Sequence, residues 1–211
     1  MKKLFILILA GMMAAPSFAQ FDTSRSHSRF NHSDTEIYYG LRLGLNIASL
    51  SSDDAEIDMD SRTGLAFGGV CGFQLANSAP VWLETGVFYS EKGGENNYND
   101  GKVTCRLSYF QVPMVLKYAF DVYDDFYIQP YLGGYLALGI TGKVKKYATK
   151  ESYSSFNDMN RLDGGLRIGC GFEYQMLYAE LGLDLGLANI GKDDFDSVRT
   201  RSLFINIGVN F

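Results

Sequence analysis

The sequence predicts an all-β fold, an eight-stranded antiparallel up-and-down transmembrane β-barrel. Three observations lead to this prediction. Apolar residues alternate with small or polar residues along eight segments between Ile37 and Phe211. The connections between these segments alternate between short and long. The 211 residues include 23 Gly, 14 Tyr and 15 Phe but only 4 Pro. This composition is typical of membrane strands flanked by aromatic belts.

Residues 1–19 have the features of a cleavable signal peptide. Two lysines precede the apolar stretch Leu4–Ala15, and small residues stand three and one positions before Gln20. We therefore expect export of the mature chain to the outer membrane. Residues 20–36 are polar and include both histidines of the sequence, so we expect a flexible periplasmic segment ahead of the barrel.

Each predicted strand has a period of two, which places alternate side chains on opposite faces of a sheet. In the first strand, Leu41, Leu43 and Leu45 alternate with Arg42 and Gly44. The same pattern recurs seven times. In order, the predicted strands are Tyr39–Ala48, Gly64–Leu75, Val81–Ser90, Phe110–Tyr118, Ile128–Ile140, Gly165–Tyr174, Glu180–Leu187 and Leu203–Phe211.

The connections separate the two ends of the predicted barrel. Short turns are expected at Asn77–Ala79, Asp121–Asp125 and Gln175–Met176. Outer-membrane barrels have short periplasmic turns and longer extracellular loops. We therefore place the short turns and both termini in the periplasm. Four long loops are expected on the extracellular side: Ser51–Ser61, Glu91–Lys102, Gly142–Asn160 and Asn189–Arg201.

The second face of the strands decides between a membrane barrel and a soluble lipocalin-like ligand-binding barrel. This face is rich in glycine and has few charges, as suits the crowded interior of an eight-stranded barrel. Buried charges must be paired, so we expect a lumenal polar network that leaves no open pore. Its members are Arg42, Glu84, Lys117, Asp163, Arg167, Glu173, Glu180 and Asp184.

Aromatic residues collect at the strand ends on the predicted periplasmic side, where they would form an interfacial girdle. These residues are Phe73, Tyr118, Phe120, Phe126, Phe172, Tyr174 and Phe211. A terminal aromatic such as Phe211, which closes an amphipathic strand, resembles the signal read by bacterial barrel-assembly machinery.

The inventory of chemical groups argues against an enzyme. The only histidines, His27 and His32, precede the first strand, so the barrel itself offers no histidine for a catalytic triad. The three cysteines, Cys71, Cys105 and Cys170, form no CxxC pair and fit the role of small apolar residues. The formal charge of −5 also argues against a nucleic-acid partner. We expect no cofactor.

Two of the expected loops have a distinctive charge. The first contains carboxylates that are weak candidates for a divalent metal site, although a solvated acidic loop is the better interpretation. They are Asp53, Asp54, Glu56, Asp58 and Asp60. The third loop contains lysines suited to phosphates of outer-membrane lipid or lipopolysaccharide, or simply to solvent. They are Lys143, Lys145, Lys146 and Lys150.

Three segments resemble the small outer-membrane β-barrel proteins of Gram-negative bacteria called PorT-like, the outer membrane protein beta-barrel domain family. They are Tyr109–Tyr118, Gly169–Tyr174 and Gly186–Ile190, with Gln111 where the family usually has Glu. The resemblance implies a barrel without catalytic residues. We expect a structural or interaction protein that contacts an envelope protein or host ligand through its loops. An accessory role in protein secretion is the alternative.

Overall fold

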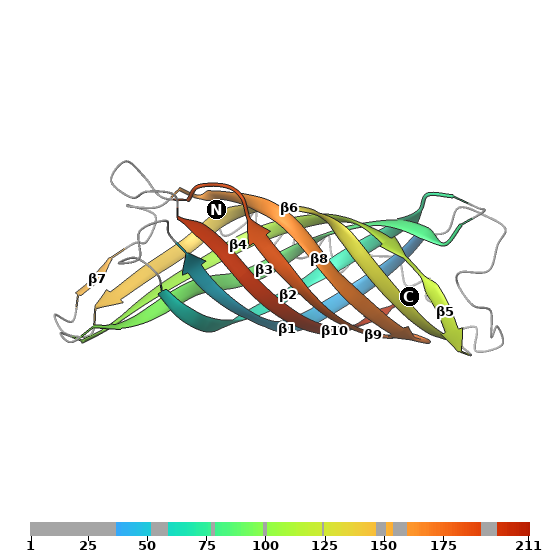
Figure 1. Cartoon of the computed structure of the whole chain (residues 1–211), viewed down its shortest axis with the longest axis horizontal. Helices are drawn as coiled ribbons and strands as arrows, with labels where there is room; N and C mark the ends of the chain where they lie inside the picture. Colours follow the sequence, from blue (N-terminus) through green and yellow to red (C-terminus); the bar gives the residue numbers. More distant parts are fainter. Residues whose placement is uncertain are drawn as a thin grey trace, which may run out of the picture.

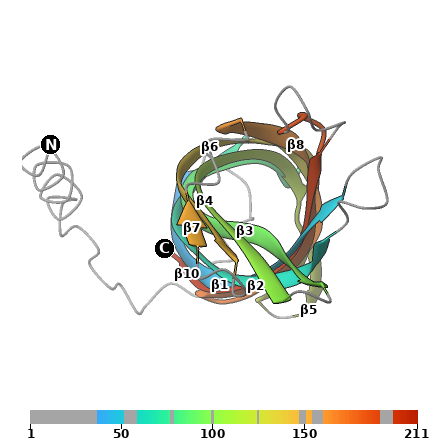
Figure 2. The same ribbon diagram turned by 90° about the vertical axis from the view of Figure 1, so that its left-hand side faces the viewer.

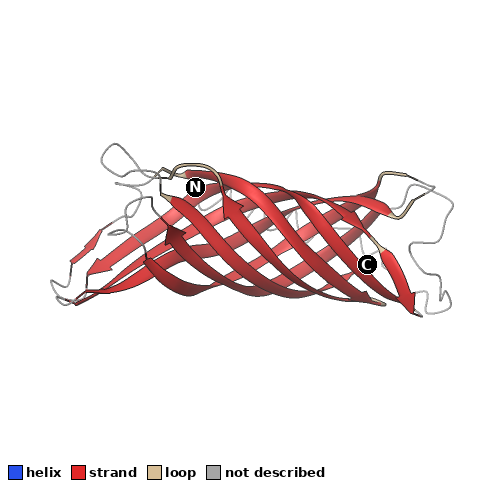
Figure 3. Cartoon of the chain, viewed as in Figure 1, coloured by secondary structure: helices blue, strands red, loops and turns tan. Residues whose placement is uncertain are grey.

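The computed structural model describes residues 37–51, 59–76, 79–98, 101–123, 125–146, 151–153, 160–190 and 198–211. These residues form strands, turns and short connections, without helices (Figure 3). Accordingly, none of them belongs to a helix of the length and apolarity needed to cross a membrane. The predicted signal peptide and periplasmic segment, residues 1–36, lie outside the described part of the chain.

Ten strands run along the described chain, and most are longer than the apolar alternation predicted (Figure 1). Their bounds are β1 Ile37–Ser51, β2 Met59–Gln74, β3 Val81–Tyr98, β4 Gly101–Tyr118, β5 Phe120–Tyr123, β6 Phe126–Lys146, β7 Glu151–Tyr153, β8 Leu162–Tyr174, β9 Leu177–Gly186 and β10 Arg199–Asn210.

Eight of these strands close a barrel in up-and-down order, which confirms the predicted fold class. The hydrogen-bonded order is β4-β3-β2-β1-β10-β9-β8-β6, and pairing of β4 with β6 completes the ring (Figure 2). All pairs are antiparallel. The short strands β5 and β7 are additions that pair with the two ends of β6.

The first and last strands of the barrel meet along most of their length. Gly40 lies opposite Asn210, and the register continues to Ser51 opposite Arg199. The backbone of Tyr39 donates to and accepts from the backbone of Phe211 at 2.9 and 2.8 Å. Closure therefore leaves neither strand with an open edge, as a hydrocarbon environment requires.

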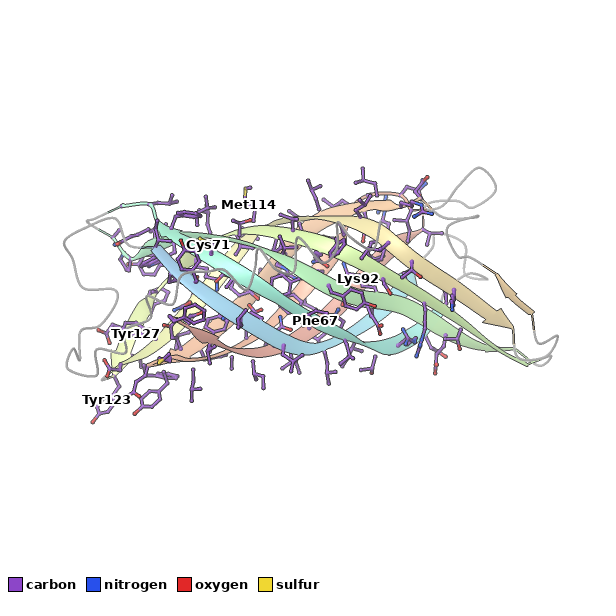
Figure 4. All side chains as sticks on the ribbon, turned by 180° about the vertical axis from the view of Figure 1, so that it is seen from behind. Phe67, Cys71, Lys92, Met114, Tyr123 and Tyr127 are labelled. Atoms are coloured by element: carbon purple, nitrogen blue, oxygen red, sulfur yellow. The ribbon has the colours of Figure 1, made fainter. Side chains whose placement is uncertain are left out.

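Apolar side chains cover the outside of the barrel, so the soluble lipocalin-like alternative is wrong. Leu41, Met114 and Leu132 are 57–58% exposed, and Met114 projects away from the ribbon (Figure 4). The inward side chains between them are buried. In β9, exposed and buried residues alternate without exception from Leu177 to Gly186. This arrangement suits a barrel surrounded by lipid.

Aromatic side chains face outward at the end of the barrel where the short turns lie. Phe120, Tyr174 and Phe211 are each about half exposed, and Tyr123 is 74% exposed. The two tight turns here contain residues with positive φ, Asp125 at 62° and Gln175 at 55°. The Asp121–Asp125 connection was predicted as a turn alone, but Phe120–Tyr123 pairs with β6 as β5.

All four expected long loops contain strand residues, so their predicted bounds are wrong. In the predicted loop Glu91–Lys102, β3 continues to Tyr98 and β4 begins at Gly101. In the predicted loop Ser51–Ser61, the strand residues are Ser51 and 59–61. In Gly142–Asn160 they are 142–146 and 151–153, and in Asn189–Arg201 they are 199–201. The apolar alternation stops where the outer face becomes polar, but the ladder of backbone hydrogen bonds continues beyond that point.

Gly93 shows how a sequence that resembles a turn continues as a strand. Its φ of 142° suits glycine, and a Cβ there would clash with the backbone carbonyl of Cys105 on β4. Glycine lets the two backbones approach and keeps β3 paired with β4. As a result, β3, β4 and β6 extend beyond the other strands at the end opposite the short turns (Figure 1).

Two outward-facing leucines on and beside β9 allow the cost of a charge to be measured at two depths in the membrane. Leu183→Arg places a cation on the lipid side near the middle of β9, where it should cost about 2–4 kcal/mol. Leu187→Arg places the same cation just beyond the strand and should cost about 0–1 kcal/mol. Both leucines are outward and exposed. Urea unfolding in lipid vesicles measures both variants, and equal costs would contradict the register.

Candidate functional site

The inside of the barrel is the only place where the eight predicted polar residues could meet, and the structure brings them there. All eight side chains are buried, with exposed fractions of 7% or less. They come from five strands: Arg42 from β1, Glu84 from β3, Lys117 from β4, Asp163, Arg167 and Glu173 from β8, and Glu180 and Asp184 from β9. The lumen is therefore a polar core enclosed by an apolar wall.

One cluster of this core is centred on Glu84, toward the end of the barrel with the short turns. Lys117 Nζ donates to Glu84 Oε2 at 2.8 Å, and Arg42 Nη2 lies 3.6 Å from the same oxygen. The hydroxyl of Tyr38 also donates to Glu84 Oε2, at 2.5 Å. Lys117 donates in addition to the hydroxyl of Tyr178 at 2.6 Å. Two cations and a phenol thus stabilise one buried carboxylate.

A second cluster is centred on Asp184, higher in the lumen. Arg167 binds this carboxylate with two parallel hydrogen bonds, from Nε at 2.7 Å and from Nη2 at 3.0 Å. Gln111 Nε2 donates to Asp184 Oδ2 at 2.7 Å. Lys92 Nζ lies between two carboxylates, 3.6 Å from Asp184 and 3.7 Å from Asp163. This arrangement links β3, β4, β8 and β9 across the lumen.

The remaining two carboxylates accept hydrogen bonds from side-chain amides. Glu173 Oε2 accepts from Gln129 at 2.9 Å and from Asn210 at 2.7 Å. Glu180 Oε1 accepts from Asn206 at 2.7 Å. The amides belong to β6 and β10, so these contacts bring further strands into the network. Every predicted lumenal carboxylate therefore has a partner from another strand.

Aromatic rings fill the space between the charged clusters. The Arg42 guanidinium lies 3.8 Å from the centre of the Tyr178 ring, and Arg167 lies 4.2 Å from that of Phe204. Such stacking favours both the cation and the ring. Glycine makes room for the rings, since a Cβ on Gly182 would clash with Phe204. These rings and the charged groups therefore share the described part of the lumen.

Lys92 is the lumenal cation that the sequence reasoning missed. It was assigned to the loop Glu91–Lys102, but it lies in β3 and is only 1% exposed (Figure 4). Its ammonium group also lies 4.2 Å from the centre of the Tyr135 ring. The signal was present in the sequence, because Phe88, Ser90 and Lys92 continue the inward period of two.

The weak metal candidates gain no support from the described residues. Asp60 is exposed in β2, and Asp53, Asp54, Glu56 and Asp58 lie outside the described part of the chain. Nowhere in that part do three or more His, Cys, Asp or Glu side chains gather as a possible metal site. The three cysteines, all within the described residues, form no disulfide, and Cys105 is fully buried.

Three of the four lysines expected in the third loop belong to strand β6. They are Lys143, Lys145 and Lys146, and Lys150 lies outside the described residues. The side chain of Lys143 is exposed.

The pair of Lys117 and Glu84 can be tested by a double-mutant cycle. Lys117→Met leaves Glu84 short of a buried cation and should cost about 3–5 kcal/mol. The combination with Glu84→Gln should cost less than the two single changes added together, with a coupling of about 1–3 kcal/mol. Urea unfolding in vesicles gives these values. Exposed Arg201→Met is the control and should change stability by less than about 0.5 kcal/mol. Additive costs for the pair would argue against a direct interaction.

Among the solved structures that are similar to this chain, the first supports the barrel fold. The Neisserial surface protein A (NspA) matches 85% of this chain and 100% of its own, at 17% identity and a TM-score of 0.50. Ail of Yersinia pestis matches 83% of this chain and 99% of its own, at 12% identity and a TM-score of 0.47. OprG from Pseudomonas aeruginosa matches 86% and 98%, at 12% identity and a TM-score of 0.47. No curated protein sequence matches the chain.

A family model gives the more specific assignment. The model described as "Outer membrane protein beta-barrel domain" matches residues 18–191, which is most of the chain. The matched residues include nine of the ten strands in full, β1 to β9, and end before β10. The chain therefore belongs to the outer membrane protein beta-barrel domain family.

Proposed function

We propose that this protein is a non-enzymatic outer-membrane barrel that neither conducts solutes nor catalyses a reaction, and that acts through its extracellular end. The observation that supports this proposal is the filled lumen. Its carboxylates are held by cations and amides from neighbouring strands, and aromatic rings occupy the space between them. A lumen stabilised in this way serves the fold and offers no free nucleophile or passage.

The extracellular end has the features of an interaction surface. There β3, β4 and β6 rise above the other strands, and β7 pairs with the end of β6 (Figure 1). Backbone hydrogen bonds continue through this extension, so its shape is set by the barrel. A raised sheet whose backbone is already ordered by hydrogen bonds reduces the entropy lost on binding a partner. An envelope protein or a host ligand would bind here.

The proposed route to the membrane uses both ends of the chain. Residues 1–19 would direct export and be removed, and Phe211 would present the terminal strand to the assembly machinery of a Gram-negative cell. The Phe211 side chain is about half exposed, beside the β1–β10 closure. The secretion role implied by the PorT-like resemblance stays a prediction. Loss of cargo export in a strain lacking this protein would support it.

Conductance in planar lipid bilayers tests whether the lumen is closed. The full chain should give no stepwise current. Combined shortening of Lys92, Arg167 and Asp184 to alanine removes the upper cluster and should produce current steps. The control replaces the outward residues Leu41, Met114 and Leu132 by alanine and should stay silent. Current steps from the unaltered protein would contradict the proposal of a closed, non-conducting barrel.

Hydrolysis assays test the non-enzymatic part of the proposal. The refolded protein should release no fatty acid from phospholipid or lipid A vesicles. Release that disappears in Glu84→Gln or Asp184→Asn, while the folded protein still migrates differently before and after boiling, would overturn it. Those two carboxylates are the centres of the two lumenal clusters, so they would be the first candidates for acid–base work.

A further inference from the structure

The exposed apolar side chains of the outer wall form a band, called the apolar belt below. A cationic patch lies on the outer wall where β4 and β6 extend beyond this belt. Arg106 on β4 is directly opposite Lys143 on β6, and both side chains are exposed. One step closer to the belt, Ser108 is opposite Thr141. Two cations and two hydroxyls thus form a square of four adjacent side chains. Like charges that face each other across strands destabilise a sheet, and the Glu91 carboxylate lies on the same face beside them.

A β-bulge turns this patch outward. The β4–β6 register shifts between Ser108 and Tyr109, so that Tyr109 pairs with Gly139 and Ser108 pairs with Thr141. Ile140 is the extra residue, and both Ile140 and Thr141 are exposed. Without the bulge, the alternation along β6 would turn Thr141 and Lys143 toward the lumen. Bulges of this kind re-aim side chains and are common near functional sites.

The same residues surround a hollow of about 180 Å³. It is lined by Glu91, Arg106, Ser108, Thr141, Gly142 and Lys143. The Glu91 carboxylate also lines it and accepts a hydrogen bond from the Tyr89 hydroxyl at 3.0 Å. Two cations and one carboxylate leave a net positive charge, which suits a phosphate group.

The apolar belt begins directly below the hollow. Phe110 is 43% exposed on β4, and Leu138 and Ile140 are 55% and 39% exposed on β6. The rings of Phe67 and Tyr89 stack on the neighbouring strands at 5.1 Å between centroids. A ligand for this surface would have a phosphate at the hollow and hydrocarbon along the belt. The hollow lies at the end away from the termini, which faces the outer leaflet.

We propose that Arg106, Lys143, Ser108 and Thr141 bind a phosphate of an outer-leaflet lipid, the phosphorylated glycolipid lipid A, from outside the barrel. The cations form charge-assisted hydrogen bonds with the phosphate oxygens, and the two hydroxyls donate to the same group. The acyl chains lie against Phe110, Leu138 and Ile140. This site is independent of the lumen and of any partner bound at the extracellular end.

The test is a titration of the purified full chain in detergent with diphosphoryl lipid A, followed by native mass spectrometry. Arg106→Gln combined with Lys143→Gln should weaken binding about tenfold or more, because two charge-assisted hydrogen bonds are lost. The matched control is Arg199→Gln with Arg201→Gln, which removes two exposed cations from β10 across the barrel. It should bind like the unaltered protein. The exchange Arg106→Lys with Lys143→Arg should also retain binding.

The effect of the Gln double variant should depend on the phosphate groups of lipid A. Lipid A without phosphates should bind the unaltered protein and the Gln double variant equally. All variants should keep their heat-dependent migration in gels, which shows that they fold. Equal weakening in the β10 control would mean that net charge alone governs binding, and the site would be wrong. Complete displacement of the lipid by millimolar inorganic phosphate would replace the lipid site by a free-anion site and overturn the proposal.

Discussion

Closure of the sheet is the constraint on which the rest of this structure depends. A strand edge in hydrocarbon would leave backbone N–H and C=O groups without partners, at several kcal/mol each. The register of β1 against β10, from Gly40–Asn210 to Ser51–Arg199, removes that edge. Once the ring is closed, the strand period of two decides on which face of the sheet each side chain lies. Each residue faces either lipid or a narrow lumen, and a shift by one residue would exchange the two.

The lumen then has to be filled by what the inner face provides. In a barrel of eight strands this space is just wide enough for side chains. Buried charges there are tolerated because they have polar partners: Arg167 pairs with Asp184 and Lys117 with Glu84, while Glu173 and Glu180 accept hydrogen bonds from amides. Such pairs contribute little net stability compared with apolar packing, but breaking one is costly. We infer that they fix the register, because a slipped strand would leave its charge facing hydrocarbon without a partner.

The contrast between the lipid-facing and lumenal sides of each strand explains which features could be predicted from the sequence. The strands were predictable where one face meets lipid, because apolar residues such as Leu183 alternate there with polar lumenal residues such as Asp184. Prediction failed where both faces of a strand are polar, above the belt. Lys92 was missed for that reason, and so was the continuation of β3 through Gly93. Partners within the lumen, such as Lys92 with Asp163, depend on strands distant in sequence and could not be assigned from periodicity.

The same contrast indicates where function can be located. The lipid face between the turns is committed to the membrane, and the lumen is committed to its own pairing. Side chains free of both demands lie at the end of the wall opposite the short turns, where β3, β4 and β6 rise above the other strands. The bulge beside Ile140 lies at this boundary and turns polar side chains outward directly above apolar ones. A family of barrels with one fold can therefore acquire different ligands by changing residues above the belt, without disturbing the pairing below it.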